Sequence, residues 1–276
     1  MRTVRDVEIH LTHSCNLACE SCSHYSNQGH TGILLLDEAD YWMKLWNSRI
    51  SPQIFSLLGG EPTIHPNLTE AVSLSRKNWP DAKLRIVTNG FFLHQHPNLP
   101  FVLKEDPNSI IELSIHHNSP EYRISLKPIL ELLDRWKEYG INVSYFESYA
   151  NWTRRYYGFG SAMRPFTDND PRRSWEICPA RYYQLFEGKI WKCAPLAYLK
   201  IQDAKYGLSS DWKPYVEYTP LEPNCTDEEL DVFFDKEEES YCGMCSASLE
   251  KFEPPLPFRH GSNRLHADIK QAKQEV

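Results

Sequence analysis

The first half of the chain alternates short strand-like runs with longer helical patterns, and this alternation restricts the fold more than any other feature. Apolar, β-prone runs lie at residues 7–12, 54–58, 84–88, 110–116 and 141–147. Helical patterns lie between them at residues 36–48, 67–79 and 121–140. Strands separated by helices predict right-handed crossovers and a parallel sheet. Because a complete eight-stranded barrel needs about 250 residues, we expect an α/β fold that forms a partial, open barrel of the (β/α)6 type.

The character of the chain changes near residue 165. A turn-rich, polar stretch at residues 164–180 precedes the sequence YYQLFEGKIWKC, which predicts a β-hairpin with its turn at Glu187–Gly188. An acidic, loop-rich stretch then leads to YCGMC. We therefore expect a partial barrel at residues 1–165, a small loop-rich domain with the hairpin at 166–255, and a weakly helical tail at 256–276.

Charge and hydropathy argue against two classes of partner. The net charge is -7 and no run of Lys or Arg exceeds a pair, so we expect no nucleic acid. The sequence shows neither the apolar region of a secretory signal nor a membrane-spanning stretch, so we expect no membrane contact and a cytoplasmic location. In such a chain, eight cysteines indicate metal binding or redox chemistry rather than disulfides.

Three cysteines follow the first predicted strand with the spacing C-x3-C-x2-C, namely Cys15, Cys19 and Cys22. The carboxyl edge of a β/α barrel is where active sites form. A set of thiolates alone favours zinc or an iron–sulfur cluster. A structural zinc ion needs a fourth ligand, for which His13 and His24 are available.

This spacing after a first strand resembles the signature of the radical S-adenosylmethionine (SAM) enzymes. The resemblance implies that the three thiolates bind a [4Fe-4S] cluster whose fourth iron is left for SAM. A Gly-Gly-Glu-Pro motif follows the second predicted strand, as it does in that family, and glycine there lets the backbone approach a cofactor closely. The implied SAM contacts are Gly59, Gly60, Glu61 and Pro62, followed by Asn89, Ser114 and His116 at later strand ends.

One position departs from the family pattern. Many members carry an aromatic residue directly before the third cysteine, close to the adenine of SAM, whereas this chain has Ser21. Tyr25 or His24 is available to take its place, and the alternative is an adenine held by backbone alone.

Four of the remaining cysteines resemble the twitch domain, the shortened form of the SPASM extension. Cys178 precedes the predicted hairpin, Cys193 ends it, and Cys242 and Cys245 form a C-x-x-C pair. The resemblance implies one auxiliary [4Fe-4S] cluster bound by these four thiolates. Without the N-terminal motif, the same pattern also matches a zinc ribbon. Cys225 is left over.

The resemblance also implies an activity. SAM would be cleaved reductively, and the resulting 5′-deoxyadenosyl radical would take a hydrogen atom from the substrate. A flavodoxin or ferredoxin would be the reducing partner, and the auxiliary cluster would accept an electron from the substrate. The expected reaction is oxidation of a polar small molecule resembling a sugar or aminocyclitol, with modification of a ribosomally made peptide as the alternative. An iron–sulfur electron carrier and a zinc-binding structural module remain open as other classes.

No catalytic acid or base stands out in the sequence. The segment NWTRRYYGFG at residues 151–160 follows the fifth predicted strand and would lie over the barrel mouth. Its aromatic and basic side chains would either hold a polar substrate or form a packed bridge between the domains. The catalytic candidates are Glu147, Arg154 and Cys225.

Overall fold

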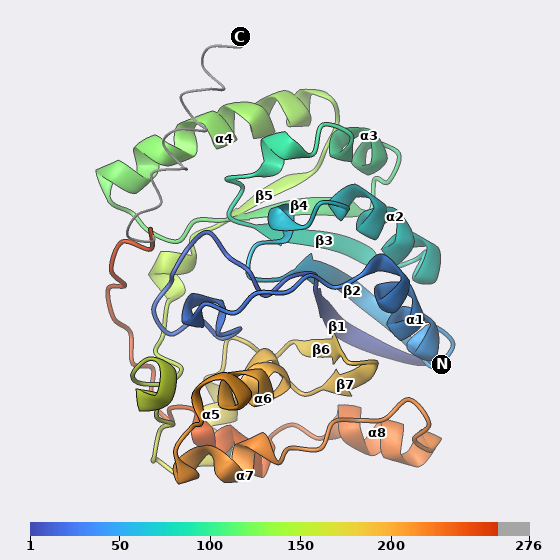
Figure 1. Ribbon diagram of the computed structural model, residues 1–276. Coiled ribbons are helices and arrows are strands. Elements are labelled where there is room, and N and C mark those ends of the chain that lie inside the picture. Colours follow the sequence, from blue (N-terminus) through green and yellow to red (C-terminus); the bar gives the residue numbers. More distant parts are fainter. Residues whose placement is uncertain (259–276) are drawn as a thin grey trace.

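The computed structural model describes residues 1–258, which are built around one seven-stranded sheet (Figure 1). The strand order is β5-β4-β3-β2-β1-β6-β7, and the two ends of the sheet do not pair with each other, so the barrel is open. This confirms the predicted partial barrel. The five parallel strands that follow one another in chain order are β1 (Arg2–His10), β2 (Ile50–Leu58), β3 (Lys83–Thr88), β4 (Ser109–Ser114) and β5 (Val143–Phe146).

Helices connect these strands, as the sequence pattern predicts. Helix α4 begins where the Ser119 side chain accepts a hydrogen bond from the Tyr122 amide, with Pro120 at its first position. Helix α3 was not expected from the sequence, since it is only six residues long. The four connecting helices are α1 (Leu36–Trp46), α2 (Leu68–Asn78), α3 (Leu99–Lys104) and α4 (Pro120–Glu138).

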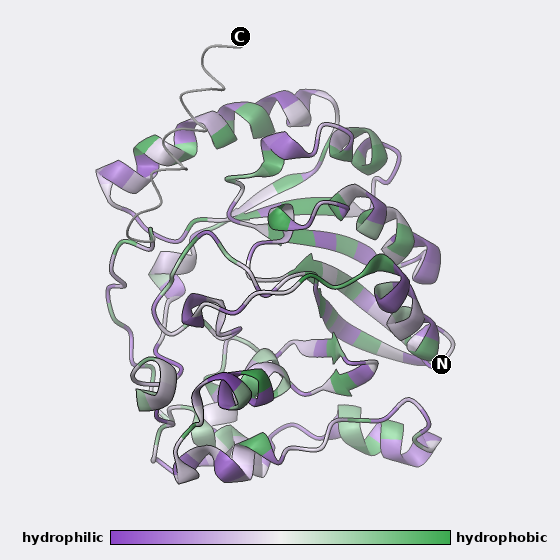
Figure 2. Cartoon of the chain, viewed as in Figure 1, coloured by the Kyte–Doolittle hydropathy of each residue, from purple (hydrophilic) through white to green (hydrophobic). Residues whose placement is uncertain are grey.

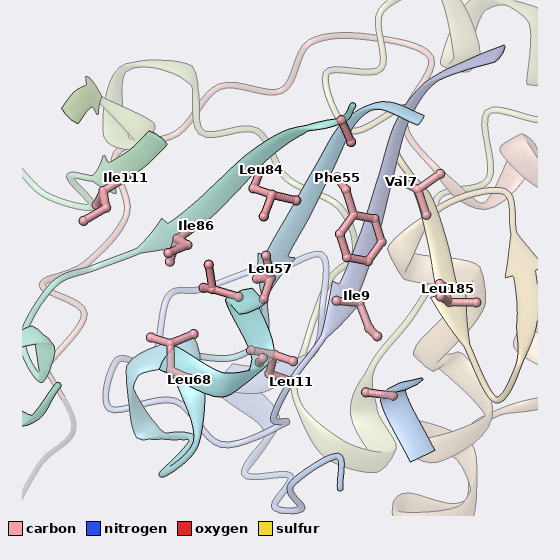
Figure 3. Close-up of a cluster of buried hydrophobic side chains, with 14 of the residues drawn as sticks. Val7, Ile9, Leu11, Phe55, Leu57, Leu68, Leu84, Ile86, Ile111 and Leu185 are labelled. Atoms are coloured by element: carbon pink, nitrogen blue, oxygen red, sulfur yellow. The ribbon is translucent and has the colours of Figure 1, made fainter. Parts of the chain in front are cut away.

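Hydrophobic and hydrophilic residues alternate along parts of the strands (Figure 2). Successive residues of a strand point to opposite faces, so the two faces of the sheet differ. One face is apolar, and its side chains form the main core with α1, α2 and α4. Figure 3 shows part of this core, with strand side chains lying beside Leu68 of α2. The opposite face carries polar and charged residues at the intervening positions, such as Glu8, Arg85 and Glu112. The apolar set includes Val7, Ile9, Phe55, Leu57, Leu84, Ile86 and Ile111.

The predicted hairpin is present and belongs to the same sheet. Strand β6 (Tyr183–Phe186) runs parallel to β1, and β7 (Lys189–Trp191) returns antiparallel to β6. The turn residues Glu187 and Gly188 both have positive φ, 54° and 71°, as a two-residue hairpin turn of type I′ requires. The sixth parallel strand therefore lies beside β1 rather than beyond β5. The proposed boundary at residue 165 remains a prediction.

The chain beyond the hairpin contributes to a second hydrophobic core, which includes Trp191, Trp212 and Met244. The acidic stretch expected to be loop-rich contains helix α8, because Thr226 and Glu229 form a capping box at its start. The helices of this half are α5 (Pro171–Glu176), α6 (Ala194–Tyr206), α7 (Lys213–Val216) and α8 (Asp227–Asp235).

The end of the described chain returns to the barrel (Figure 1). The Ala18 amide donates to the Pro257 carbonyl at 2.7 Å, and the Phe258 ring stacks on Tyr122 with centroids 5.5 Å apart. Residues 256–258 of the predicted tail are thus packed, and the remainder of that tail lies outside the described residues. In residues 1–258 we find no helix with the length and apolar character of a membrane span.

Candidate active site

The loop that follows β1 is called the cysteine loop and carries Cys15, Cys19 and Cys22. The Gly-Gly-Glu-Pro motif packs against the start of this loop. The Gly60 amide donates to the Thr12 carbonyl at 2.7 Å, and the Glu61 amide donates to the Ser14 carbonyl at 2.9 Å. A Cβ atom at Gly60 would lie 2.2 Å from the Ser14 carbonyl oxygen, and one at Gly59 would lie 2.6 Å from that of Thr12. Glycine is therefore required at both positions because the two loops touch there. The sequence predicts a close approach of this backbone to a cofactor, but not this contact between the loops.

The Glu61 carboxylate is satisfied within the protein. Its Oε1 accepts from the Thr63 amide at 3.0 Å, from the Thr63 hydroxyl at 2.6 Å and from the Thr88 hydroxyl, while Oε2 accepts from the Asn89 amide at 2.8 Å. Burial raises the pKa of Glu61, and these hydrogen bonds oppose that rise. Glu61 thus connects the motif to the end of β3, and its predicted contact with SAM remains a prediction.

Two polar side chains from neighbouring strand ends reach the cysteine loop. Asn89 Nδ2 lies 2.8 Å from Asn16 Oδ1, and His116 Nδ1 lies 3.5 Å from Cys19 Sγ. The Asn16 Nδ2 atom is buried and has no hydrogen-bond partner among the described residues. A buried donor without a partner, next to a set of thiols, fits a bound group that supplies acceptor atoms, as a cluster or SAM does.

A cavity of about 320 Å³ lies at this edge of the sheet. Tyr25 does not line it: the ring is buried in the second core, where its hydroxyl donates to the Pro195 carbonyl at 3.3 Å. Pro62 is buried at the start of a short 3-10 turn and does not line the cavity either. The predicted site residues on the cavity wall are Cys22, Gly59, Gly60, Glu61, Asn89, Ser114 and His116.

The floor of this cavity carries charges that the sequence reasoning missed. Arg85 Nη2 lies 3.6 Å from Glu8 Oε1, and Arg85 Nη1 lies 4.0 Å from Glu112 Oε2. Gln184 Nε2 donates to Glu8 Oε2 at 2.6 Å. Burial nevertheless raises the pKa of Glu8 to about 7. The available signal was the polar residue between apolar neighbours in each strand, which indicates a polar face opposite the core.

Arg154, a predicted catalytic candidate, forms ion pairs with two other segments of the chain. Its Nη1 donates to Glu20 Oε1 at 2.6 Å and its Nε donates to Glu250 Oε1 at 2.9 Å. The guanidinium also lies 4.2 Å from the centroid of the Phe252 ring. Beside it, Trp152 Nε1 donates to the Glu20 carbonyl at 2.7 Å. These contacts hold the segment after β5 against the cysteine loop.

The other two catalytic candidates do not line the cavity. The Glu147 carboxylate is half-exposed and pairs with Arg123 at 3.3 Å. Cys225 lies beside Arg49, whose Nη1 donates to its Sγ at 3.1 Å. Neither residue lines this cavity or the one beside the later cysteines, so a catalytic role for each remains a prediction.

The four later cysteines of the predicted auxiliary site line a second cavity, of about 290 Å³. Cys178 follows α5, Cys193 precedes α6, and Cys242 and Cys245 lie in and after a short 3-10 turn. Burial raises the pKa of Cys245 to about 12, and the neighbouring thiols Cys178 and Cys242 add to that rise. A bound cationic metal centre would remove this cost of ionisation, so the donor set fits a group bound through four thiolates.

Within residues 1–258, no three side chains of Cys, His, Asp or Glu converge closely enough to hold one metal ion. A cubane cluster differs from a single ion because each thiolate binds a different iron. Its ligands therefore surround a volume rather than one point. The two cavities meet, since Arg155 and Ala180 line both of them.

Comparisons with known proteins concern the part of the chain that forms the first site, and the fold. The family model described as the Radical SAM superfamily matches residues 9–150. The GTP 3′,8-cyclase of Aquifex aeolicus is 27% identical over 153 residues, which cover 51% of this chain and 47% of that protein. A probable GTP 3′,8-cyclase of Saccharolobus islandicus is 31% identical over 121 residues, 44% of this chain and 37% of that protein. The chain thus spans less than half the length of these curated relatives.

A solved structure resembles the chain over most of its length. It is the crystal structure of BtrN in complex with AdoMet and 2-DOIA, which is 16% identical, with 92% of this chain and 99% of that chain covered and a TM-score of 0.50. At this identity the likeness concerns the fold alone.

Proposed function

The chain belongs to the radical SAM superfamily, and on that premise we propose that it oxidises a polar small molecule, resembling a sugar or aminocyclitol, in the cavity at the carboxyl edge of its sheet. A radical SAM enzyme uses a [4Fe-4S] cluster and SAM, which together supply a 5′-deoxyadenosyl radical that takes a hydrogen atom from the substrate. The observation that carries the proposal is the placement of Cys22, of Gly59, Gly60 and Glu61, and of a charged floor around one cavity.

The chain's own residues would divide the work at the first site. Cys15, Cys19 and Cys22 would bind the cluster, with the loop held in place by the backbone contacts of Gly60 and Glu61. The Asn89, Ser114 and His116 side chains, which line the same cavity, would contact SAM. We assign Glu61 a positioning role, since its carboxylate already accepts four hydrogen bonds within the protein.

The second site would hold one auxiliary [4Fe-4S] cluster through Cys178, Cys193, Cys242 and Cys245. Its four thiols surround one cavity, which supports this assignment over a set of unrelated cysteines. The shared wall with the first cavity would place the cluster beside the substrate. That position suits an acceptor for the electron that the substrate loses on oxidation.

The floor of the cavity supports a polar substrate. Glu8, Arg85 and Glu112 offer carboxylates and a guanidinium that bind hydroxyl and amino groups. A substrate without hydrogen-bonding groups would displace water from these charges, which the long Arg85–Glu8 and Arg85–Glu112 contacts compensate only in part. A flavodoxin or ferredoxin would supply the electron that starts the reaction.

The test is the iron and sulfide content of anaerobically purified protein, followed by reduction in the presence of SAM. We expect about eight irons per chain, as two cubane clusters require, and formation of 5′-deoxyadenosine. About four irons with one zinc would retain the radical chemistry and refute the auxiliary cluster. Absence of iron would refute the proposed function.

Cysteine variants assign the metal to the two sites. Cys19→Ala should abolish cleavage of SAM, and Cys242→Ala should remove about half of the iron. Cys225→Ser is the matched control, since Cys225 lies outside both cavities and contacts Arg49. Loss of iron in the control as large as in Cys242→Ala would contradict the assignment of the four ligands.

A further inference from the structure

Arg155 is the charged residue that lines both cavities. Its guanidinium forms no hydrogen bond or ion pair with any residue in the part of the chain described, 1–258. The adjacent Arg154 provides the contrast, because it is paired with Glu20 and Glu250. One arginine of the pair thus holds the segment in place, and the other presents unpaired donors where the cavities meet.

The backbone of Arg155 is fixed although its side chain is not paired. The Arg155 amide donates to Ser21 Oγ at 2.5 Å, and the Tyr156 amide lies 3.3 Å from the same oxygen. The Tyr156 hydroxyl donates to the Cys22 carbonyl at 3.3 Å. Ser21 is buried, with 2% of its surface exposed. The residue directly before the third cysteine therefore sets the position of Arg155, and this is the role of serine where many family members have an aromatic ring.

We propose that the Arg155 guanidinium binds an oxygen atom of the substrate where the two cavities meet, and that the same charge acts on the auxiliary cysteines. A partly buried guanidinium without a partner is costly, and its planar set of donors fits hydroxyl, carboxylate or phosphate oxygens. The auxiliary cysteines are neighbours of this charge, since Arg155 lines the second cavity together with Cys178, Cys193, Cys242 and Cys245. The inference rests on the proposed function, because it requires a substrate in the first cavity and a cluster in the second.

Two consequences follow from one charge in this place. A substrate whose oxygen binds to Arg155 is held at the wall that faces the auxiliary site, so the guanidinium selects which part of the molecule lies there. A positive charge beside four thiolates stabilises the more negative, reduced form of their cluster. Arg155 should therefore raise the reduction potential of the auxiliary cluster as well as position the substrate.

The experiment compares Arg155→Gln, Arg155→Lys and the parent as anaerobic holoenzymes with SAM bound. The binding probes are myo-inositol, for a hydroxyl oxygen, and inorganic phosphate, for an anionic oxygen, titrated by calorimetry. We expect at least one probe to bind the parent and to bind Arg155→Gln at least tenfold more weakly. Arg155→Lys should also bind weakly, because an ammonium group lacks the planar pair of donors.

The second readout is the midpoint potential of the auxiliary cluster, followed by electron paramagnetic resonance. Arg155→Gln should lower the potential, and Arg155→Lys should restore it, since lysine keeps the charge. If Arg155 had a purely structural role, both variants would change the affinity for the probes and the midpoint potential of the auxiliary cluster together. Arg181→Gln is the matched control for binding, because Arg181 lines the second cavity and not the first.

Each outcome decides the inference. The inference is overturned if neither probe binds the parent, or if Arg155→Gln binds both probes as tightly as the parent does. An equal loss of binding in Arg181→Gln would also overturn it. Failure of the proposed function is recognised separately, by missing iron or missing 5′-deoxyadenosine in the parent itself.

Discussion

Glu8 is a carboxylic acid on the polar face of β1, surrounded by other acids and by one guanidinium. Burial raises its pKa to about 7 from an ordinary value of 4.5, and the charges of Asp6 and Glu112 add to that rise. The folded protein therefore retains a proton that the unfolded chain has released. The stability that comes from keeping Glu8 protonated in the folded state is fully present below about pH 4.5. It is lost as the pH rises through the folded-state pKa of about 7.

Glu8→Gln should remove this pH dependence. The change in pKa, from 4.5 to about 7, corresponds to about 3.5 kcal/mol, at about 1.4 kcal/mol for each pKa unit. Between pH 5 and pH 8, the free energy of unfolding of the variant relative to the parent should rise by up to about 3 kcal/mol. Glutamine keeps an acceptor for Gln184, so the variant isolates the ionisation. Anaerobic urea unfolding at a series of pH values gives this difference, and a constant difference across the range would refute the interpretation.

Gly60→Ala should displace the cysteine loop. The added Cβ atom would lie 2.2 Å from the Ser14 carbonyl oxygen, so the backbone must move. We expect a loss of about 1–3 kcal/mol in the free energy of unfolding, with loss of iron from the first site. Gly140→Ala is the control for general destabilisation: the positive φ of 90° strains an alanine there, but the added Cβ contacts nothing, so this variant should keep its iron. A variant at Gly60 that keeps its full iron content would show that the loop tolerates the contact.

Individual residues differ in how far the sequence could identify them. The three cysteines and the Gly-Gly-Glu-Pro motif are recognisable because their spacing is local, and the structure brings Cys22 and Gly59–Glu61 to one cavity. The sequence could not separate Arg154 from Arg155, since only the contacts of the folded chain show which guanidinium is paired. The Tyr25 ring packs in the second core rather than in the cavity, and the sequence could not show this, because proximity in sequence to Cys22 does not give the direction of a side chain.

At the scale of elements, periodicity predicts the strands and the long helices well. The hairpin turn at Glu187–Gly188 also follows from local sequence, because Gly188 separates two short β-prone runs and readily adopts the positive φ that a two-residue turn requires. The pairing of β6 with β1 does not follow from local sequence. More than 170 residues separate paired positions such as Val7 and Tyr183, and a local sequence pattern does not indicate which distant strand will be the partner. Pairing at this distance is selected by packing of the whole sheet.

The hairpin is also anchored to α1, through Trp46 Nε1 donating to the Gly188 carbonyl at 2.8 Å. Trp46→Phe should lower the free energy of unfolding by about 2 kcal/mol, of which about 1 kcal/mol is the hydrogen bond and the rest is lost packing of a fully buried ring. Equilibrium unfolding measures the loss. A change below about 0.5 kcal/mol, typical of surface substitutions, would show that the anchor contributes little.

For the whole molecule, the two cores should respond differently to loss of the auxiliary site. Cys193 and Cys245 are packed against the second core, so metal bound there would stabilise that part of the chain. Cys242→Ala should speed amide hydrogen exchange in α6 and at residues 240–244. Exchange in β2, β3 and β4 should change little, because their core is separate. Equal acceleration in both regions would contradict a stabilising role confined to the second core.

The pairing of β6 with β1 has a consequence for chimeric enzymes. A chain cut after residue 165 would lose Leu185 and Ile190 from the main core. It would also leave Val7–Ile9 of β1 as an unpaired edge, which invites aggregation with other chains. Natural recombination or engineering that exchanges C-terminal portions between such enzymes must therefore carry the hairpin with the recipient barrel, and join the donor sequence after Trp191.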